Sequence, residues 1–366
     1  MSNKNNNDIS MMNYILEEKY VLLEILDRRD EISKELIEKI WNRKIDEIII
    51  TGSGTSLHAG LATKAFLERV LELRVSIEYP MPFNDLGNIF NPSNTLFIGV
   101  SQTGQSSAVI DAIKKAKKLG ALTLGISNNA NSQLYEVSDI QVSMRCGAEL
   151  CVAKTKGYIA SIAILIIIGL EIAKRKQTIT ESEYLEYIDR LYATANNFDE
   201  IITTSDKWIE SIQEELTKSK RIIVLGYGRN YGNVLEGSLK MLETMRYGIC
   251  GYEMEEFCHG PYNSVDSETF IIYLASESKY KNKVVKLKSI LNEITNHQFI
   301  ITKNIDAYEP TQKDCLIPFI DDKDFHVFEY IIPLQMISAI ISEKLGIDTM
   351  FASDPKFHSK IGSKFI

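Results

Sequence analysis

The stretch Ile48-Ile-Ile-Thr-Gly-Ser-Gly54 decides the fold, because a close copy, Ile222-Ile-Val-Leu-Gly-Tyr-Gly228, occurs in the second half of the chain. In both copies a run of apolar, mostly β-branched residues ends in a Gly-x-Gly turn. The later matches, in the same order, are residues 95–98 with 269–272, 122–126 with 298–302, and Asp139 with Asp314. Such a series predicts one structural unit that is used twice.

Within each half, short apolar runs alternate with segments of helical period. In the first half the predicted strands are residues 48–51, 75–79, 96–100, 122–126 and 140–142, and predicted helices include residues 56–71 and 106–118. Apolar strands joined by helices are typical of a parallel sheet that is covered on both faces. The sequence therefore predicts an α/β fold: two tandem three-layer αβα domains, each with a five-stranded parallel, flavodoxin-like sheet.

The expected division of the chain has five parts. They are a disordered tail (1–12), a first domain with one leading helix over 14–40 (13–180), a helical connector (181–206), a second domain (207–347) and a tail that closes the site (348–366). Each domain ends in a long apolar helix, over residues 157–173 and 328–345. The first of these is shorter than the about 20 residues that a membrane span needs, so we expect a buried core helix.

The charge of the chain narrows the classes of partner. Its 366 residues include 41 Lys and Arg against 49 Asp and Glu, a net charge of −8. This acidity argues against nucleic acid and anionic membranes as partners, but not against a small phosphorylated ligand. Residues 1–10 lack the apolar segment of a signal peptide, and the five cysteines form no Cys-x-x-Cys pair. We therefore expect a cytoplasmic protein without a disulfide framework.

A loop rich in hydroxyl groups follows the predicted strand at residues 96–100. It reads Ser101-Gln-Thr-Gly-Gln-Ser-Ser107 and leads into a helix. Hydroxyls and free N–H groups at a helix N-terminus suit an anion. The candidate donors are Ser101, Gln102, Thr103, Ser106 and Ser107, more than a simple helix cap requires. The loop predicts a phosphate site. The turn at residues 52–56 is a second such loop, without the Gly-x-Gly-x-x-Gly pattern of a dinucleotide site.

The second half differs at the corresponding position. There the chain reads Ala275-Ser-Glu277, and its carboxylate would repel a phosphate. One phosphate site per chain is therefore expected.

The second half instead carries residues suited to proton transfer. Glu236, Lys240 and Glu243 share one face of a predicted helix over 231–246, and His259 follows shortly after. A glutamate and a histidine can act as base and acid near neutral pH. The alternative is a solvated helix face with a salt bridge and an ordinary loop histidine.

Together these motifs resemble the tandem SIS (sugar isomerase) domain family of phosphosugar isomerases and deglycases, including the isomerase half of glucosamine-6-phosphate synthase. The resemblance runs from about residue 12 to the end of the chain. The matching segments are Gly52-Ser-Gly-Thr-Ser56, Ser101-Gln-Thr-Gly104, Val152-Ala-Lys-Thr-Lys156, Leu235-Glu-Gly-Ser-Leu-Lys240 with Glu243, and His259-Gly-Pro261.

The resemblance implies roles for individual residues. The substrate phosphate would be held by Ser56, Ser101, Gln102, Thr103 and Ser106, and further substrate contacts would come from Gly54, Thr55, Val152 and Lys154. Glu243 is implied as the base that moves a proton between C1 and C2 of the opened sugar, and Lys240 as the group that orients or polarises the C2 oxygen. His259 is implied as the ring-opening acid/base, supplied by the neighbouring subunit of a homodimer whose sites lie at the interface. Lys360 is implied as a substrate-facing lysine of the C-terminal tail.

The expected activity is a phosphosugar isomerase acting on a 6-phosphorylated sugar or amino sugar, without metal or other cofactor. The same chemistry on a 1-amino ketose gives an imine that water hydrolyses, so a ketosamine-6-phosphate deglycase or an amino-sugar-phosphate deaminase is the alternative. A second alternative is a non-catalytic phosphosugar-binding regulator, which would need the Ser101 loop but not Glu243 and His259. Lys154 stands where the synthase has a serine, and this leaves the identity of the substrate open.

Overall fold

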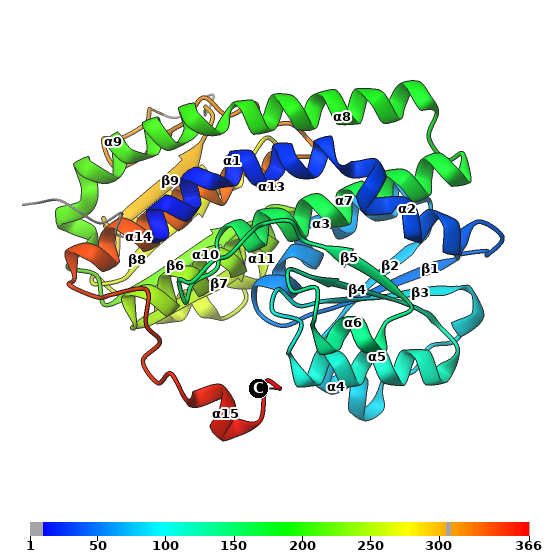
Figure 1. Ribbon diagram of the computed structural model, residues 1–366. Coiled ribbons are helices and arrows are strands. Elements are labelled where there is room, and N and C mark those ends of the chain that lie inside the picture. Colours follow the sequence, from blue (N-terminus) through cyan, green and yellow to red (C-terminus); the bar gives the residue numbers. More distant parts are fainter. Residues whose placement is uncertain (1–9, 305–308, 366) are drawn as a thin grey trace, which may run out of the picture.

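The computed structural model describes residues 10–304 and 309–365, and Figure 1 shows the order and arrangement of its elements. The first part of the chain forms α1 (Met11–Asp27), α2 (Arg29–Ile40), β1 (Glu47–Thr51), α3 (Thr55–Leu71), β2 (Arg74–Glu78), α4 (Pro80–Leu86), η1 (Pro92–Asn94), β3 (Thr95–Val100), α5 (Ser107–Leu119), β4 (Leu122–Ser127), α6 (Gln133–Val137), β5 (Ile140–Ser143) and α7 (Lys156–Lys176). The remainder forms α8 (Glu181–Asn196), α9 (Phe198–Leu216), β6 (Arg221–Gly226), α10 (Asn230–Met245), β7 (Gly248–Glu253), α11 (Met254–Phe257), η2 (Pro261–Ser264), β8 (Phe270–Leu274), α12 (Lys281–Leu291), β9 (Gln298–Thr302), β10 (Cys315–Leu316), α13 (His326–Tyr330), α14 (Ile332–Lys344) and α15 (Phe357–Ile361).

The strands form two five-stranded parallel sheets with the same order of strands. The first sheet runs β2-β1-β3-β4-β5 and the second β10-β9-β8-β6-β7. All of the pairings are parallel, for example Ile48 beside Leu96 and Ile222 beside Phe270. This is the flavodoxin-like order, so the predicted fold class is confirmed. In such sheets ligands bind beyond the carboxyl ends of the strands, where the order reverses between β1 and β3 or between β6 and β8.

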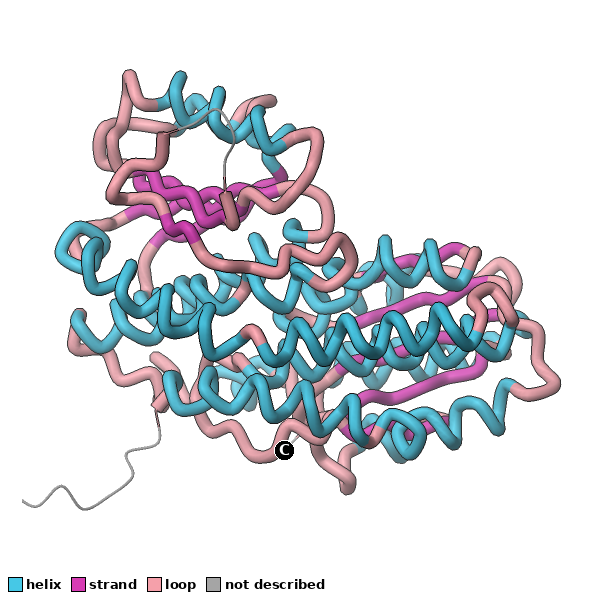
Figure 2. Tube along the Cα trace, turned by 90° about the horizontal axis from the view of Figure 1, so that it is seen from above, coloured by secondary structure: helices cyan, strands magenta, loops and turns pink. Residues whose placement is uncertain are grey.

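Helices cover both faces of each sheet. Helices α4, α5 and α6 cover one face of the first sheet, and α11 and α12 cover one face of the second. The other two faces share one continuous apolar core, because α3 packs on both α7 and α10, and α10 packs on α14. Figure 2 shows the two sheets as separate groups of strands. The site elements described below lie where these inner layers meet.

Helix α7 is the most apolar helix of the fold. Among the described helices it alone is long and apolar enough to cross a bilayer by length and composition. However, 94% of its most apolar 18-residue stretch is buried inside the protein. The prediction of a buried core helix is therefore confirmed.

The leading segment differs from the prediction in two ways. Residues 1–9 of the expected tail lie outside the described residues, but α1 already begins at Met11, because Ser10 and Asn13 cap its first turn reciprocally. The prediction of a single helix over residues 14–40 is wrong, since the backbone of Arg28 leaves helical geometry at φ −100° and ψ 12°. Acidic residues then favour a new helix start at α2.

The connector is helical, as α8 and the first part of α9. Because α9 continues to Leu216 without a break, the predicted domain boundary at residue 207 falls inside this helix. The division of the chain into domains stays a prediction.

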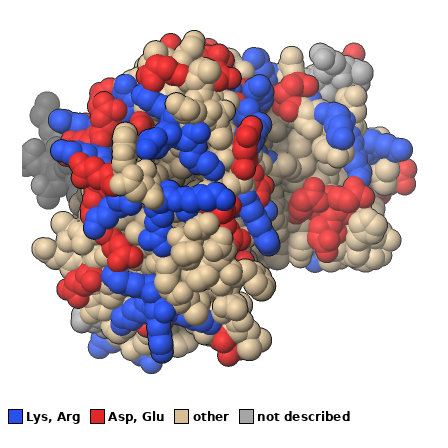
Figure 3. All heavy atoms as spheres, turned by 90° about the vertical axis from the view of Figure 1, so that its right-hand side faces the viewer, with Lys and Arg blue, Asp and Glu red and all other residues tan. Residues whose placement is uncertain are grey.

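The surface is mixed in charge. On the face drawn in Figure 3, acidic and basic side chains are interspersed. Such a pattern is typical of a solvated protein surface.

The contact between α3 and α10 depends on a glycine. A Cβ atom at Gly232 would lie 2.7 Å from both the backbone nitrogen and the Cβ of Ala62, and 2.8 Å from the carbonyl oxygen of His58. Gly232→Ala should therefore lower the free energy of unfolding by about 1–3 kcal/mol, despite the better helix propensity of alanine. Chemical denaturation measures this loss. Gly248→Ala, where a Cβ meets nothing within 4 Å, is the matched control, and equal stability of the two variants would contradict the prediction.

Candidate active site

The centre of the site is an ion-pair network on α10. The Lys240 side chain is 1% exposed, and its Nζ lies 2.7 Å from Glu243 Oε2 and 3.4 Å from Glu236 Oε1. It also donates to Thr55 Oγ1 at 3.1 Å. These three partners occupy the three donors of the ammonium group. Lys240 therefore holds Glu243 in place and has no free donor for the C2 oxygen that the family resemblance assigned to it.

Glu236 ties α10 to the start of α3. Its side chain is fully buried, and it accepts hydrogen bonds from Thr55 Oγ1 at 2.9 Å and pairs with His58 Nδ1 at 2.8 Å. Thr55 is thus a supporting residue of the network. Sequence reasoning missed His58: its spacing from Thr55 puts the two on one helix face, but nothing in the sequence directs that face toward Glu236.

Burial and charge set the protonation of the network. Burial alone would raise the pKa of Glu236, but Lys240, His58 and Thr55 outweigh it and hold that pKa below its ordinary value. Burial raises the pKa of Glu243 above its ordinary value, and Lys240 offsets only part of this rise. Burial would lower the pKa of Lys240, but the two carboxylates raise it well above normal. Glu236 is therefore an ionised structural partner, whereas Glu243 is a carboxylate with increased basicity.

Three hydroxyls of the Ser101 loop are available, whereas that of Ser107 donates to Gly362 O. Gly104 has φ +65°, and a Cβ there would come within 2.2 Å of the Ser132 side chain, so this turn requires glycine. Within the part of the chain that the structure describes, no hydrogen-bond partner exists for the hydroxyls of Ser101, Thr103 and Ser106. The loop thus presents unoccupied donors at the start of α5, as an anion site requires.

The Gln102 side chain does not join this group. Its Nε2 donates to Glu149 Oε2 at 3.0 Å, away from the hydroxyls. Glu149 also accepts from the Thr155 hydroxyl at 2.9 Å and from backbone N–H groups at the start of α7. Glu149 therefore caps α7 and fixes the Ser101 loop to it. No sequence pattern pointed to Glu149, which lies in an irregular loop.

The turn after β1 begins α3 beside the network. Gly54 adopts φ +54°, a conformation that favours glycine, and Ser56 follows in the first turn of the helix with its side chain buried. Val152 lines a groove together with Glu243. The other lining residues of this groove are Leu242, Arg246, Tyr247, Ala352 and Ser353.

Lys154 is held by the backbone of its own loop. Its Nζ donates to the carbonyl oxygens of Glu149 at 2.5 Å and Cys151 at 2.7 Å. Burial lowers the pKa of Lys154, the Glu149 charge opposes this, and the charges of Lys364 and Lys240 lower it further. Lys154 therefore lies near the same centre of charge as Glu243.

Two of the predicted residues are exposed and pair with acidic side chains other than Glu243. The His259 side chain, in the turn after α11, is 71% exposed and lies 3.4 Å from Glu255. Lys360, in α15, is 63% exposed and pairs with Asp354 at 2.6 Å.

The end of the tail does reach the phosphate loop, as the red segment in Figure 1 shows. Ser107 donates its N–H to Ser363 O at 3.2 Å and its hydroxyl to Gly362 O at 3.0 Å. Phe365 N–H donates to the Gln105 carbonyl at 2.9 Å. Lys364 pairs with Ser106 as an isolated antiparallel bridge. Sequence reasoning missed Lys364, since no spacing distinguishes it from the other lysines of the tail.

Burial lowers the pKa of Lys364, and the Glu243 charge opposes that shift. The charge of Glu243 therefore acts on Lys364 of the tail, whereas Lys360 pairs with Asp354.

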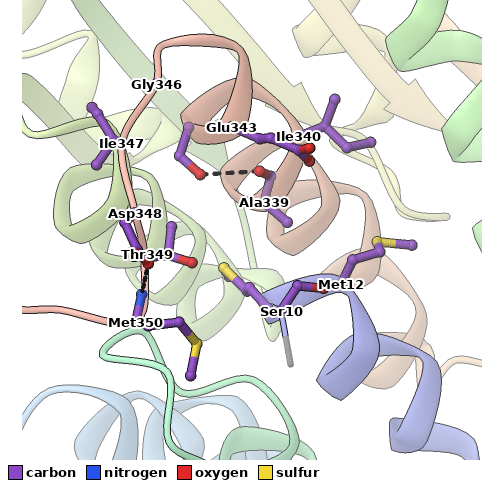
Figure 4. A pocket seen from close by; sticks show the side chains of 12 residues that line it. Ser10, Met12, Ala339, Ile340, Glu343, Gly346, Ile347, Asp348, Thr349 and Met350 are labelled. Atoms are coloured by element: carbon purple, nitrogen blue, oxygen red, sulfur yellow. Dashed lines mark hydrogen bonds between the residues drawn. The ribbon is translucent and has the colours of Figure 1, made fainter. Parts of the chain in front are cut away.

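A second hollow lies away from this centre, between the start of α1 and the end of α14 (Figure 4). Its ionisable side chains, Glu343 and Asp348, are both exposed. Among residues 10–304 and 309–365, no group of three or more His, Cys, Asp or Glu side chains could hold a metal ion.

Comparisons with known proteins identify related chains. A family model described as SIS domain matches residues 39–167. The structure of a candidate phosphosugar isomerase from Clostridium difficile is 33% identical with a TM-score of 0.91, covering 98% of this chain and 99% of that one. A candidate sugar-binding protein from Salmonella typhimurium is 30% identical with a TM-score of 0.82, covering 90% of this chain and 99% of that one.

The curated relatives are longer proteins. Glutamine–fructose-6-phosphate aminotransferase (isomerizing) from Bacteroides thetaiotaomicron is 28% identical over 321 residues, which is 85% of this chain and 50% of that protein. The chain thus spans about half the length of the curated relatives it matches.

The network makes Lys240 important for stability. Lys240→Met leaves Glu236 buried without its main partner and should cost about 3–5 kcal/mol of unfolding free energy at neutral pH. The pKa of Glu236 is held below its ordinary value in the folded chain, so this stabilisation is present above the ordinary glutamate range and is lost as pH falls through the folded pKa. Denaturant melts at several pH values measure both effects.

Lys344→Met, at an exposed lysine of α14, is the matched control for this loss. Adding Glu236→Gln to Lys240→Met should restore part of the stability, because the buried charge is then removed. Wild-type stability of Lys240→Met would show that the network contributes nothing.

Proposed function

Because the chain belongs to the SIS-domain family of phosphosugar isomerases, we propose that it is an isomerase of a 6-phosphorylated sugar or amino sugar. The reaction is proton transfer between C1 and C2 of the ring-opened substrate. The observation that carries this proposal is Glu243: a largely buried carboxylate with a raised pKa, fixed by Lys240 and bordering a groove.

The phosphate of the substrate binds at the Ser101 loop. The hydroxyls of Ser101, Thr103 and Ser106 are the donors, and the backbone N–H groups at the start of α5 add a positive dipole end. A bound phosphate fixes the position of the carbon chain, so that C1 and C2 lie at Glu243. Such fixed positioning makes proton transfer effectively intramolecular.

The Glu243 carboxylate takes a proton from the carbon next to the carbonyl. The electron pair of the broken C–H bond forms a C1–C2 double bond, and the carbonyl π pair moves onto the oxygen, giving an enediolate. The hydroxyl proton on the other carbon's oxygen passes to this oxygen, Glu243 returns the first proton to the former carbonyl carbon, and the new carbonyl forms on the other carbon, which completes the aldose–ketose exchange. Its raised pKa favours the first step, since a stronger base removes a carbon-bound proton more readily.

A deglycase is the second candidate. On a 1-amino ketose the same proton removal gives an enolamine, and water hydrolyses its imine tautomer to release the amine. Lys154 supports this candidate, because it adds a positive charge near the site at a position where the synthase has an uncharged serine.

The protein acts as a homodimer with His259 delivered to the neighbouring subunit. The exposure of this side chain, which pairs with Glu255 and not with Glu243 of its own chain, supports such an exchange. In the dimer, His259 is the acid/base that opens the sugar ring.

The deciding experiment incubates the protein with fructose 6-phosphate, glucosamine 6-phosphate or a fructosamine 6-phosphate and follows each by NMR. An isomerase exchanges the C1 or C2 proton and interconverts aldose and ketose without releasing an amine. Released amine or ammonia identifies a deglycase or a deaminase. Binding without any conversion or proton exchange would leave only a phosphosugar-binding regulator.

Two variants separate the base from the phosphate loop. Glu243→Gln should lower kcat by about 1,000-fold and leave phosphosugar binding intact. Ser101→Ala with Thr103→Ala should weaken binding by at least about ten-fold, because hydrogen bonds to a phosphate are lost. The acid limb of the wild-type pH profile should lie above the usual glutamate range, because the pKa of Glu243 is raised and its base form is lost as pH falls through it. Retained turnover in Glu243→Gln would disprove the assignment.

Mixed dimers test the shared site. When Glu243→Gln and His259→Asn chains are co-expressed, each mixed dimer contains one site with both groups intact. We expect about a quarter of wild-type activity from a random mixture, against almost none from either variant alone. No recovery in purified mixed dimers would place His259 and Glu243 of one site on the same chain.

A further inference from the structure

The proposed reaction requires a cation that is free to meet the substrate. When Glu243 removes a proton, negative charge develops on the carbonyl oxygen of the sugar, and a donor aimed at that oxygen lowers the barrier. The candidates are the lysines near Glu243 and in the tail. This inference rests on the proposed function.

Three of these lysines are unsuited to that role. Lys240 has each of its donors directed to a protein acceptor. Lys154 donates twice to carbonyl oxygens of its own loop. Lys360 is exposed to solvent in its pair with Asp354.

Lys364 differs from all of them. Its side chain is half-buried, and its Nζ has no hydrogen bond to any residue of the part that the structure describes. The charge of Glu243 acts on it, and its own charge acts on Lys154. Lys364 is therefore an uncommitted cation whose charge interacts with that of the proposed base.

The backbone fixes this position. Hydrogen bonds on either side of Lys364, from Ser107 to Ser363 and from Phe365 to Gln105, hold the tail across the start of α5. Lys364 itself pairs with Ser106. The residue thus lies beside the Ser101 loop through its backbone, and its charge interacts with that of Glu243.

We propose that Lys364 donates a hydrogen bond to the substrate oxygen that becomes negative when Glu243 removes the carbon-bound proton. As the C–H electron pair forms the C1–C2 double bond, the carbonyl π pair moves to this oxygen and meets the ammonium group. The proton remains on Glu243 until it returns to carbon, and Lys364 stays protonated throughout. Partial burial strengthens the interaction, since a less hydrated ammonium attracts an oxyanion more strongly than one in bulk water.

The kinetic test compares three lysines of the same tail. Lys364→Met should lower kcat by at least about 100-fold while KM changes less than about three-fold, because the contact forms mainly in the transition state. Lys356→Met, at an exposed lysine of the tail, is the control and should keep wild-type kinetics. Lys360→Met tests the lysine that the family resemblance favours.

A binding test gives a readout that does not depend on turnover. The carboxylate of 5-phosphoarabinonate mimics the charged enediol, whereas glucitol 6-phosphate carries the phosphate without that charge. By calorimetry, Lys364→Met should weaken the first by at least about ten-fold and the second by less than about two-fold. A tail that only closes the site would change both affinities equally.

The outcomes separate the two proposals. Wild-type kinetics in Lys364→Met, in an active enzyme, overturns the role of Lys364 and leaves the proposed function intact. The same holds if Lys360→Met loses kcat and Lys364→Met does not. If the wild-type chain neither converts nor binds any of these phosphosugars, the proposed function is overturned, and the role of Lys364 with it.

Discussion

One ammonium group, that of Lys240, holds the site and the fold together. It neutralises Glu236, which has no contact with solvent, and the same group fixes Glu243 at the edge of a groove. Glu236 in turn binds Thr55 and His58 at the start of α3. Because a buried carboxylate is tolerated only with such partners, the position of the base and the packing of α3 on α10 depend on the same contacts.

The two sheets carry different parts of one site. The loop after β3 supplies free hydroxyls, and α10, which follows β6, supplies the carboxylate. The tail links them, because Lys364 pairs with Ser106 through its backbone and its charge interacts with that of Glu243. A net charge of −8 gives no guide to such a site, because hydroxyls, helix N–H groups and a few lysines create a local environment that differs from the average of the surface. The chemistry depends on where α3, α10 and the tail meet.

Much of this arrangement could be predicted from the sequence, and the limits have physical causes. The sheets were predictable because strand and helix periods are local, and Lys240 with Glu243 because their spacing puts them on one helix face. The partner of Glu236 across the interface, His58, was not predictable, since tertiary packing alone decides which helix faces meet. The direction of the Gln102 side chain toward Glu149 and the position of Lys364 in the tail depend on loop geometry. Loops have no periodic sequence pattern from which that geometry could be predicted.

The continuous core between the inner helix layers has a consequence for how this protein can change over evolutionary time. Helices α3 and α7 of the first half and α10 and α14 of the second cover one another's apolar surfaces. Either half on its own would expose that surface to water and would be prone to aggregate. Gene fragments that carry a single half are therefore poor building blocks for recombination, even though each half contains a complete sheet. The two halves must be inherited, and must adapt, together.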